Sequence, residues 1–430
     1  MFMMKTLCEM KKTIADGGFD AALTALYGEK DLCLQRTRYA SLTDSFASVY
    51  GEKNDIRFFS APGRTEVCGN HTDHNKGCVL AAGINLDAIA CVAANDENIV
   101  RLKSVEYPKE DVVDLAVLTP VAEEKDHSAA LIRGVAARFV QLGYKVGGFD
   151  CVTTNRVIAG SGLSSSAAFE VLVGTIFNYL YNDGAISAVE IAKIAQYAEN
   201  VFFGKPCGLM DQMACSVGGF VQIDFADTEK PVITPVTFDF TSCGHALVIT
   251  DTRASHADLT DEYAAIRKEM ESVAAVFGKS CLRETDEAEV MANMALVREK
   301  CGERACLRAM HFYNDNRRVE KEAEALKAGD FESFKKLVIE SGNSSYMYNQ
   351  NVFVKIKDAG QPVSLALALS DSVLNGRGAW RVHGGGFAGT IQAFVPKDLL
   401  DTYIATLESV FGEGACYVLS IRSVGGTEVK

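Results

Sequence analysis

Disulfides, zinc clusters and membrane spans find no support in this sequence. Its 13 cysteines are odd in number and include no Cys-x-x-Cys pair, which favours reduced thiols over a disulfide framework or a metal cluster. No apolar run approaches the roughly 20 residues of a membrane span, and residues 1–13 contain no apolar core of signal-peptide length. We therefore expect a soluble, cytoplasmic protein without a membrane partner.

An excess of positive charge is also lacking, because 43 Lys and Arg residues stand against 56 Asp and Glu residues, for a net charge of −13 at neutral pH. Nucleic acids and anionic membranes are bound by basic surfaces, so we expect neither as a partner. A phosphate-bearing substrate remains compatible with this charge, since backbone N–H groups can bind it locally. The hydrophobic content of 48% is ordinary for a globular chain with a sizeable core, and 430 residues favour two or three domains.

The pattern along the chain predicts an α+β protein without internal repeats. Residues 1–50 carry apolar side chains at three- and four-residue spacing, which is typical of helices. Helical patterns also fill most of the chain between residues 252 and 375. Two of the eight prolines lie in a strand-like stretch, 220–240, that suggests a domain boundary. We predict a helical extension at 1–50 and two domains at 51–235 and 236–430.

A Gly- and Ser-rich loop, "GSGLSSSAA" at 160–168, lies between a predicted strand and a predicted helix. Such a junction directs free N–H groups and the positive helix end at an anion, so the loop could bind phosphate. It lacks the Gly-Lys-Ser/Thr ending of a Walker A loop and the glycine spacing of a dinucleotide fingerprint. The alternative is a helix end packed closely against a sheet.

Three further stretches could carry chemistry. In "CGLMDQ", 207–212, Asp211 has apolar neighbours and could serve as a base or ligand, or simply cap a helix. The run "HGGGFAGT", 383–390, permits either a close backbone approach or a hairpin turn. In "GNHTDHNKG", 69–77, a metal site is disfavoured because the other five histidines are scattered, whereas these side chains suit sugar hydroxyls. Arg64 follows a Pro-Gly turn and could hold anionic oxygens.

Taken together and in this order, these stretches resemble the GHMP small-molecule kinases, specifically the galactokinase branch. The galactokinase signature G-R-x-N-L-I-G-E-H-T-D-Y-N-x-G corresponds to "GRTEVCGNHTDHNKG" at 63–77, and the second motif, G-x-G-L-S-S-S-A-A, matches 160–168. The family stretch around C-G-x-M-D-Q matches "AENVFFGKPCGLMDQ" at 198–212, and the family's GGGFGGC corresponds to "GGGFAGT" at 384–390. The resemblance extends from about residue 59 to the C-terminus.

The resemblance implies the two-domain GHMP kinase fold, with the active site in the cleft between the domains. ATP phosphates are expected over the Gly/Ser loop, and Mg²⁺ is expected on Ser166 (or Ser165) and Glu199, whose hard oxygens suit that ion. Asp211 is expected to orient the sugar C1 hydroxyl and accept its proton, beside Arg64. The expected phosphate-binding residues are Gly160, Ser161, Gly162, Leu163, Ser164, Ser165 and Ser166, and the expected sugar-binding residues are Asn70, His71, Asp73, Tyr263 and Gly385.

Three departures from the family signature bear on the substrate. Asn70 replaces a Glu that in the family touches the C6 hydroxyl, His74 replaces a Tyr, and "EVCG" replaces "NLIG". The predicted reaction is the ATP-dependent 1-phosphorylation of galactose. The alternative is a hexose with a modified C6, such as galacturonate, because loss of the Glu charge would tolerate a carboxylate there. Plant galacturonate kinases also lack this Glu and carry His at the last position.

A non-catalytic sugar sensor is an alternative of another class, since some galactokinase relatives act as regulators. Loss of parts of the second motif is expected in such a regulator, whereas Ser165, Ser166, Glu199, Asp211 and Arg64 are all present here. We also expect a monomer or a weak homo-oligomer.

Overall fold

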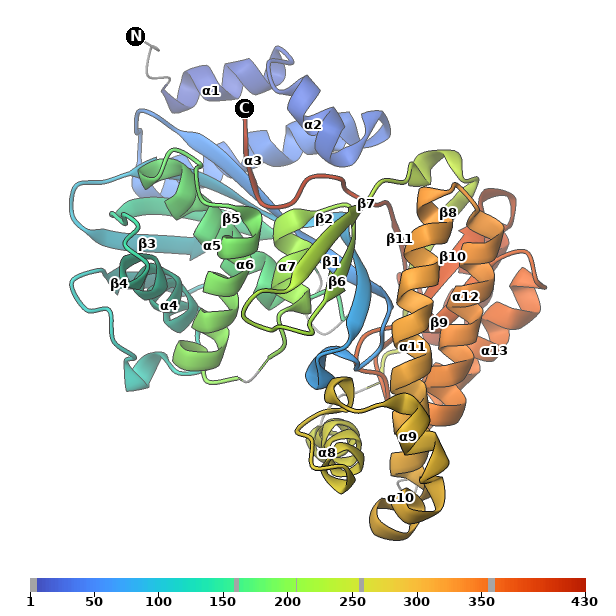
Figure 1. The fold of residues 1–430 in the computed structure, drawn as a ribbon. Coiled ribbons are helices and arrows are strands. Elements are labelled where there is room, and N and C mark those ends of the chain that lie inside the picture. Colours follow the sequence, from blue (N-terminus) through green and yellow to red (C-terminus); the bar gives the residue numbers. More distant parts are fainter. Residues whose placement is uncertain (1–5, 158–161, 206, 255–258, 355–359) are drawn as a thin grey trace.

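Two β-sheets organise the described chain, which comprises residues 6–157, 162–205, 207–254, 259–354 and 360–430 of a computed structural model (Figure 1). The larger sheet has the strand order β12-β1-β2-β5-β3-β4, and β6 and β7 extend it from β2. Its strands are β1 (Arg57–Cys68), β2 (Cys78–Ala94), β3 (Ile99–Ser104), β4 (Glu110–Asp114), β5 (Phe149–Asn155), β6 (Phe220–Asp224), β7 (Val232–Val236) and β12 (Thr427–Val429). Among these described strands, β3 and β5 form the one parallel pair.

Helices cover both faces of the larger sheet. Successive side chains of a strand point to opposite faces, so Phe58 and Ile89 pack against the N-terminal helices while Phe59 and Ala88 pack on the other side. This double burial explains the continuous apolar run of β2, a pattern typical of fully covered strands. The helices of the second face are α4 (Ser128–Gln141), α5 (Ser165–Tyr181), α6 (Ala188–Tyr197) and α7 (Met210–Val217).

The second sheet is smaller and belongs to the other half of the chain. Its order is β11-β8-β10-β9, formed by β8 (His245–Asp251), β9 (Ala379–Val382), β10 (Thr390–Pro396) and β11 (Cys416–Leu419). Its half also contains α8 (Thr260–Val276), α9 (Glu287–Ala292), α10 (Met294–Cys301), α11 (Glu303–Lys327), α12 (Phe331–Ser344), α13 (Pro362–Leu374) and α14 (Leu400–Phe411). The long helix α11 contacts α12 as well as β1 and β2, so it links this half to the larger sheet.

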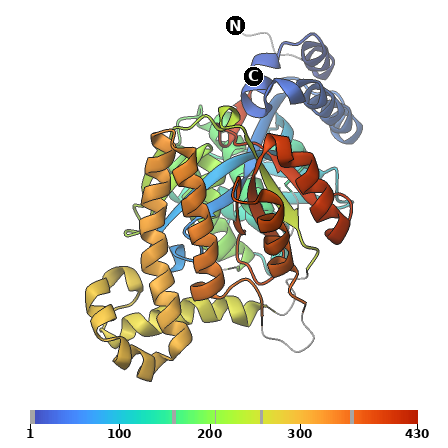
Figure 2. The same ribbon diagram turned by 90° about the vertical axis from the view of Figure 1, so that its right-hand side faces the viewer.

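The chain returns to the larger sheet at its end. β12 pairs antiparallel with β1, and its Val429 lies opposite Phe58. A division at 235/236 would therefore assign one strand of the larger sheet to the second predicted domain, and that division stays a prediction. Figure 2 shows this C-terminal segment beside the N-terminal helices.

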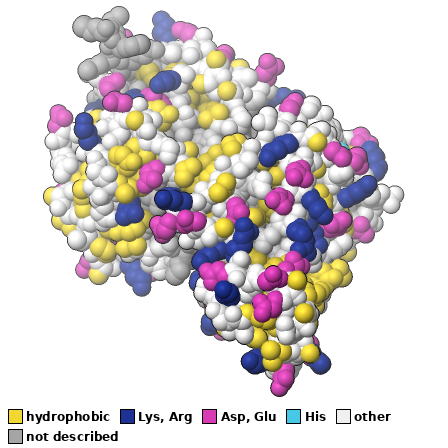
Figure 3. Space-filling model, viewed as in Figure 1, with side chains coloured by type: hydrophobic (Ala, Val, Ile, Leu, Met, Phe, Trp, Pro, Cys, Tyr) yellow, Lys and Arg dark blue, Asp and Glu magenta, His cyan; other side chains and the backbone are white. Residues whose placement is uncertain are grey.

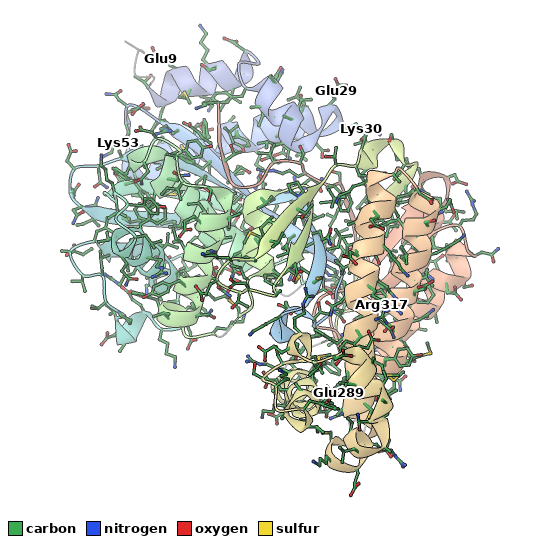
Figure 4. All side chains as sticks on the ribbon, in the orientation of Figure 1. Glu9, Glu29, Lys30, Lys53, Glu289 and Arg317 are labelled. Carbon is green, nitrogen blue, oxygen red and sulfur yellow. The ribbon has the colours of Figure 1, made fainter. Side chains whose placement is uncertain are left out.

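The N-terminal segment folds as α1 (Leu7–Ala15), α2 (Asp20–Tyr27) and α3 (Leu32–Tyr50). Its apolar face buries Leu23, Leu42 and Phe46 completely, or nearly so, against the sheet. Directly after α3, Lys53 pairs with Asp150 of β5 at 3.2 Å; Figure 4 labels this lysine at the edge of the sheet. The extension is thus an integral layer of the fold.

A buried ionic cluster attaches this layer to the sheet. Asp87 of β2 is fully buried, and its carboxylate lies 2.5 Å from Nη1 of Arg38 on α3 and 3.0 Å from Nη1 of Arg422. The hydroxyl of Tyr27 also donates to it at 2.5 Å. Burial alone would raise the pKa of Asp87, but the two guanidinium groups lower it below its ordinary value. The carboxylate therefore stays charged and holds α2, α3 and the C-terminal segment together.

The face of the molecule seen in Figure 3 carries charged side chains of both signs. Lys and Arg side chains are interspersed there with Asp and Glu. Among the described residues, no helix is both long and apolar enough to span a membrane.

We predict that Asp87→Asn destabilises the protein by about 3–5 kcal/mol, because two buried guanidinium groups then lose their counter-charge. Urea unfolding followed by circular dichroism measures this loss. Asp44→Asn is the control, because Asp44 pairs with Lys11 on the surface with 61% of its side chain exposed and should cost less than about 1 kcal/mol. Equal losses in the two variants would contradict the assigned role of the cluster.

Candidate active site

Three of the predicted motifs meet at the carboxylate of Asp211, in the first turn of α7. Arg64 of β1 binds its Oδ1 through Nε and Nη2, both at 2.8 Å. The hydroxyl of Ser164 donates to its Oδ2, and Nη1 of Arg64 donates to the carbonyl of Gly162. The Pro-Gly-Arg stretch, the Gly/Ser loop and the Cys-Gly-Leu-Met-Asp-Gln stretch therefore form one site. The predicted Pro-Gly turn is instead an irregularity within β1, where the pairing register with β2 shifts between Pro62 and Arg64.

The ion pair sets the charge of Asp211. Burial acts to raise the pKa of Asp211, but the charge of Arg64 and the hydrogen bond from Ser164 outweigh it, so the pKa lies below its ordinary value. About a third of the Asp211 side chain (34%) is exposed, compared with 7% for Arg64. The site thus presents an ionised, reachable carboxylate in front of a buried guanidinium.

The described part of the Gly/Ser loop leads directly into α5. Gly162 and Ser164 have positive φ angles of 72° and 60°, and Ser165 and Ser166 open the helix. Leu163 is buried, and its carbonyl accepts the backbone N–H of Arg64 at 3.1 Å, so it contacts a ligand at most through its backbone. The helix end directs unsatisfied N–H groups outward, as phosphate binding requires. The predicted residues Gly160 and Ser161 lie outside the described residues.

Ser166 and Glu199, the predicted metal ligands, are adjacent. The Ser166 hydroxyl lies 3.4 Å from Oε1 of Glu199, a nearly fully buried carboxylate in the π-helical turn Ala198–Phe203. Gln212 donates to Oε2 of Glu199 at 2.7 Å and to Glu170 at 3.1 Å. Burial, followed by the charge of Glu199, raises the pKa of Glu170 well above its ordinary value, so Glu170 is held neutral behind the site.

The loop at 69–77 faces the same region. Asp73 begins a short 3₁₀ turn, and its Oδ2 lies so close to Gly208 that a Cβ there would approach within 2.3 Å. Asp73 is therefore in contact with the loop that leads to Asp211. His74 is exposed, 3.8 Å from the Asp73 carboxylate.

His71 is held as a neutral imidazole. It adopts a left-handed conformation with φ of 61°, and its Nε2 donates to the carbonyl of Gly385 at 2.8 Å. Burial, followed by repulsion from His74, lowers the pKa of His71 to about 4. Across the described residues, no group of three or more His, Cys, Asp or Glu side chains is arranged to hold a metal ion. The role of His71 and His74 as polar side chains beside a sugar stays a prediction.

The triple-glycine loop is both a hairpin connection and a close approach. It joins the antiparallel strands β9 and β10. Tyr263 of α8 donates to the carbonyl of Gly386 at 3.0 Å, and a Cβ on Gly385 would lie 2.7 Å from the tyrosine ring. A side chain at Gly385 would therefore collide with Tyr263. Both sequence-based alternatives, a close backbone approach and a hairpin turn, apply to this loop.

Asn70 is buried rather than open to the site. Its Nδ2 donates to Glu66 at 2.7 Å and to the carbonyl of Gly384 at 2.8 Å, and its Oδ1 accepts from Asn351 at 2.6 Å. Its exposed fraction is 0%. Direct contact between Asn70 and a sugar stays a prediction, and it would require the side chain to exchange these partners.

Two residues of the site were missed from the sequence. His383, directly before the triple glycine, is buried between Thr65 at 3.1 Å and Thr390 at 3.0 Å. Glu66 lies two residues beyond Arg64 on β1, and Arg381 lies 3.5 Å from its carboxylate. The i, i+2 spacing on a strand could have indicated that Glu66 shares the face of Arg64.

Residues 44–94 match the family model of the galactokinase galactose-binding signature, and residues 130–219 match the model of the GHMP kinases N terminal domain. The galactokinase of Actinobacillus pleuropneumoniae serotype 3 is 32% identical over 362 residues, which cover 84% of this chain and 90% of that protein. This chain belongs to the galactokinase branch of the GHMP kinases. The galactokinase of Streptomyces coelicolor is 30% identical over 86% of this chain and 92% of its own length.

Solved structures give the same fold. Lactococcus lactis galactokinase in complex with galactose superposes with a TM-score of 0.77 at 24% identity, covering 91% of this chain and 99% of that one. A D-glycero-D-manno-heptose 1-phosphate kinase gives a TM-score of 0.58 at 17% identity, covering 87% and 99%. The predicted family and the α+β GHMP kinase fold are confirmed. The galactokinase-branch enzyme is an ATP-dependent sugar kinase, a phosphotransferase with an alcohol acceptor, and the sensor alternative is not retained.

We predict that His71 makes this galactokinase-branch enzyme less stable in acid. The unfolded chain binds a proton at His71 below about pH 6.5, whereas the folded enzyme does so only near a pKa of about 4. The contribution of the neutral His71 ring to the free energy of unfolding is therefore complete above pH 6.5 and is lost as the pH falls towards 4.

The pH dependence of urea unfolding tests this. His71→Gln should flatten the decline in unfolding free energy over this window, whereas His127→Gln should not, because His127 is exposed. An unchanged slope in His71→Gln would show that the ring is protonated as easily in the folded enzyme as in the unfolded chain.

Proposed function

We propose that this enzyme transfers the γ-phosphoryl group of ATP to the C1 hydroxyl of galactose. The observation that carries the proposal is the Asp211 carboxylate, held by Arg64 and Ser164 where the Gly/Ser loop enters α5. That position adjoins the helix end suited to the ATP phosphates, and the loop before Asp211 contacts Asp73. The names of the curated relatives support galactose as the sugar.

Asp211 acts mainly by position and charge in this proposal. Its lowered pKa keeps it ionised, so it can accept a hydrogen bond from the C1 hydroxyl, but it also makes the carboxylate a weak base. Phosphoryl transfer passes through a loose transition state and depends on alignment and charge neutralisation. The proton therefore moves to Asp211 late, while Arg64 offsets the negative charge of the transferring group.

The residues beside α5 fit Mg²⁺ as the companion of ATP. Ser166 and Glu199 supply one hydroxyl and one carboxylate, and Mg²⁺ is commonly held by few protein oxygens together with substrate phosphates and water. Lys205 lies 3.3 Å from Glu199, so the cation would replace an existing positive partner of that carboxylate. When bound, the ion neutralises charge on the ATP phosphates.

We assign sugar recognition to the 69–77 loop and to Tyr263 beside the triple-glycine loop. Asp73 would accept hydrogen bonds from ring hydroxyls, and the neutral His71 offers its unprotonated Nδ1, because Nε2 is used by Gly385. Tyr263 packs on the triple-glycine loop, and burial raises its pKa to about 12, so its hydroxyl stays protonated. A monomeric or weakly associated state, a cytoplasmic location and the absence of a nucleic-acid partner remain expectations.

The function is tested by ATP consumption with Mg²⁺ and galactose, galacturonate, glucose or N-acetylgalactosamine. We expect turnover with galactose, and we expect Asp211→Asn to lower kcat by about 10²–10⁴-fold while galactose still binds. Asp20→Asn is the matched control, since Asp20 also stands in a helical first turn and pairs with an arginine, Arg36, outside the site. Full activity of Asp211→Asn would exclude the assigned role.

We further predict that Glu199→Gln raises the Mg²⁺ concentration for half-maximal rate by about tenfold or more, because the hard anionic ligand is lost. The exposed Glu229→Gln provides the control. The measurement is the rate at fixed ATP over a Mg²⁺ titration. An unchanged Mg²⁺ requirement would remove Glu199 from the proposed ligand set.

A further inference from the structure

Positions 66 and 70 carry a reciprocal exchange relative to the galactokinase signature. The signature has Asn where this chain has Glu66 and Glu where this chain has Asn70. The two side chains are bonded here, with Asn70 Nδ2 donating to Glu66 Oε1 at 2.7 Å. A carboxylate at either position can accept a hydrogen bond from an amide at the other position. Exchanging the two residues therefore only reverses which position donates. The exchange therefore retains one carboxylate in this pair.

The amide side of the pair is fully used inside the protein. Both hydrogens of Asn70 Nδ2 have acceptors, at Glu66 and at the Gly384 carbonyl, and Oδ1 accepts from Asn351. The Ser345 hydroxyl lies 3.3 Å from the same Oδ1. Asn70 is therefore a fixed connector between β1 and the triple-glycine loop and has no spare polar atom for a ligand.

The carboxylate side has spare capacity. Glu66 is 4% exposed, and both of its contacts, to Asn70 and to Arg381 at 3.5 Å, use Oε1. Within the part of the chain that the structure describes, Oε2 accepts no hydrogen bond. A carboxylate oxygen that accepts no hydrogen bond keeps its lone pairs free for a donor on a ligand. Glu66 Oε2 is thus a candidate acceptor for a sugar hydroxyl.

Glu66 lies two residues beyond Arg64 on β1, and its partner Asn70, 2.7 Å away, directly precedes His71 in the loop that carries Asp73. Burial raises the pKa of Glu66 to about 7; Arg381 and Arg64 act to lower it, and Asp73 acts to raise it further. Arg64 is the partner of Asp211, and Asp73 is the proposed ligand of the ring hydroxyls. The charge of Glu66 is therefore felt at both ends of the proposed sugar site.

We propose that Glu66 is a specificity-determining residue, whose carboxylate selects a hexose with an uncharged C6 group over one with a C6 carboxylate. The inference rests on the proposed function, because it concerns the sugar of that same site. It opposes the galacturonate alternative, which assumed that Asn70 had removed the negative charge from this wall. A carboxylate on the sugar would meet the like charge of Glu66, and such repulsion is a common source of selectivity.

Isothermal titration without ATP tests the inference separately from phosphoryl transfer. We expect the wild-type enzyme to bind galactose more tightly than galacturonate at about pH 8.5, where a carboxyl group with this pKa is ionised. Selectivity is measured as the dissociation constant of galacturonate divided by that of galactose. The neutral, nearly isosteric Glu66→Gln should lower this ratio by about tenfold or more, whereas the charge-retaining Glu66→Asp should keep most of the selectivity. Glu428→Gln is the control, because Glu428 of β12 is also a largely buried carboxylate paired with an arginine, Arg57 at 2.6 Å.

The possible outcomes are separable. An unchanged ratio in a folded Glu66→Gln protein, or wild-type binding of galacturonate as tight as that of galactose, would overturn the inference, and the second result holds even if the variant does not fold. Selective galactose binding that depends on Glu66, but without ATP turnover, would support the inference and reject the proposed function. Turnover of galactose with a sugar selectivity that does not depend on Glu66 would support the proposed function and overturn the inference.

Discussion

The ion pair between Arg64 and Asp211 is the constraint around which the site is arranged. A guanidinium with 7% of its side chain exposed requires a counter-charge, and Asp211 supplies it from a helix 147 positions further along the chain. The same guanidinium binds the Gly162 carbonyl, and the same carboxylate accepts from Ser164. Neutralising one buried charge thereby brings β1, the start of α5 and the start of α7 together.

This arrangement also limits the chemistry that the site can perform. A carboxylate with a lowered pKa is dependably charged but takes up protons poorly. A reaction that needed strong base catalysis would suffer from such a partner, whereas phosphoryl transfer depends mainly on alignment and charge neutralisation. The geometry is thus consistent with the kinase assignment on physical grounds as well as by family.

The sequence predicted the elements of the site better than their contacts. The order and spacing of the four motifs led to the correct family and fold, because these signals are local in the sequence. The burial of Asn70 was not predictable, since the groups that saturate it, Gly384 and Asn351, come from the other half of the chain. The three-residue strand β12 is too short to show a periodic pattern. The hydrogen bond from the Ser164 hydroxyl to Asp211 was not predictable either, since the two residues are 47 positions apart, and the phosphate-binding role of Ser164 stays a prediction.

The exchange at positions 66 and 70 shows why charge must be assigned to a contact network rather than to a motif position. Considered alone, Asn70 suggests a wall that has lost a negative charge. Considered with its partner Glu66, the wall keeps that charge and moves it towards Arg64 on the same strand. Because a hydrogen-bonded amide and carboxylate can trade places without leaving a polar group unpaired, such a pair can drift in sequence while the field at the ligand is retained.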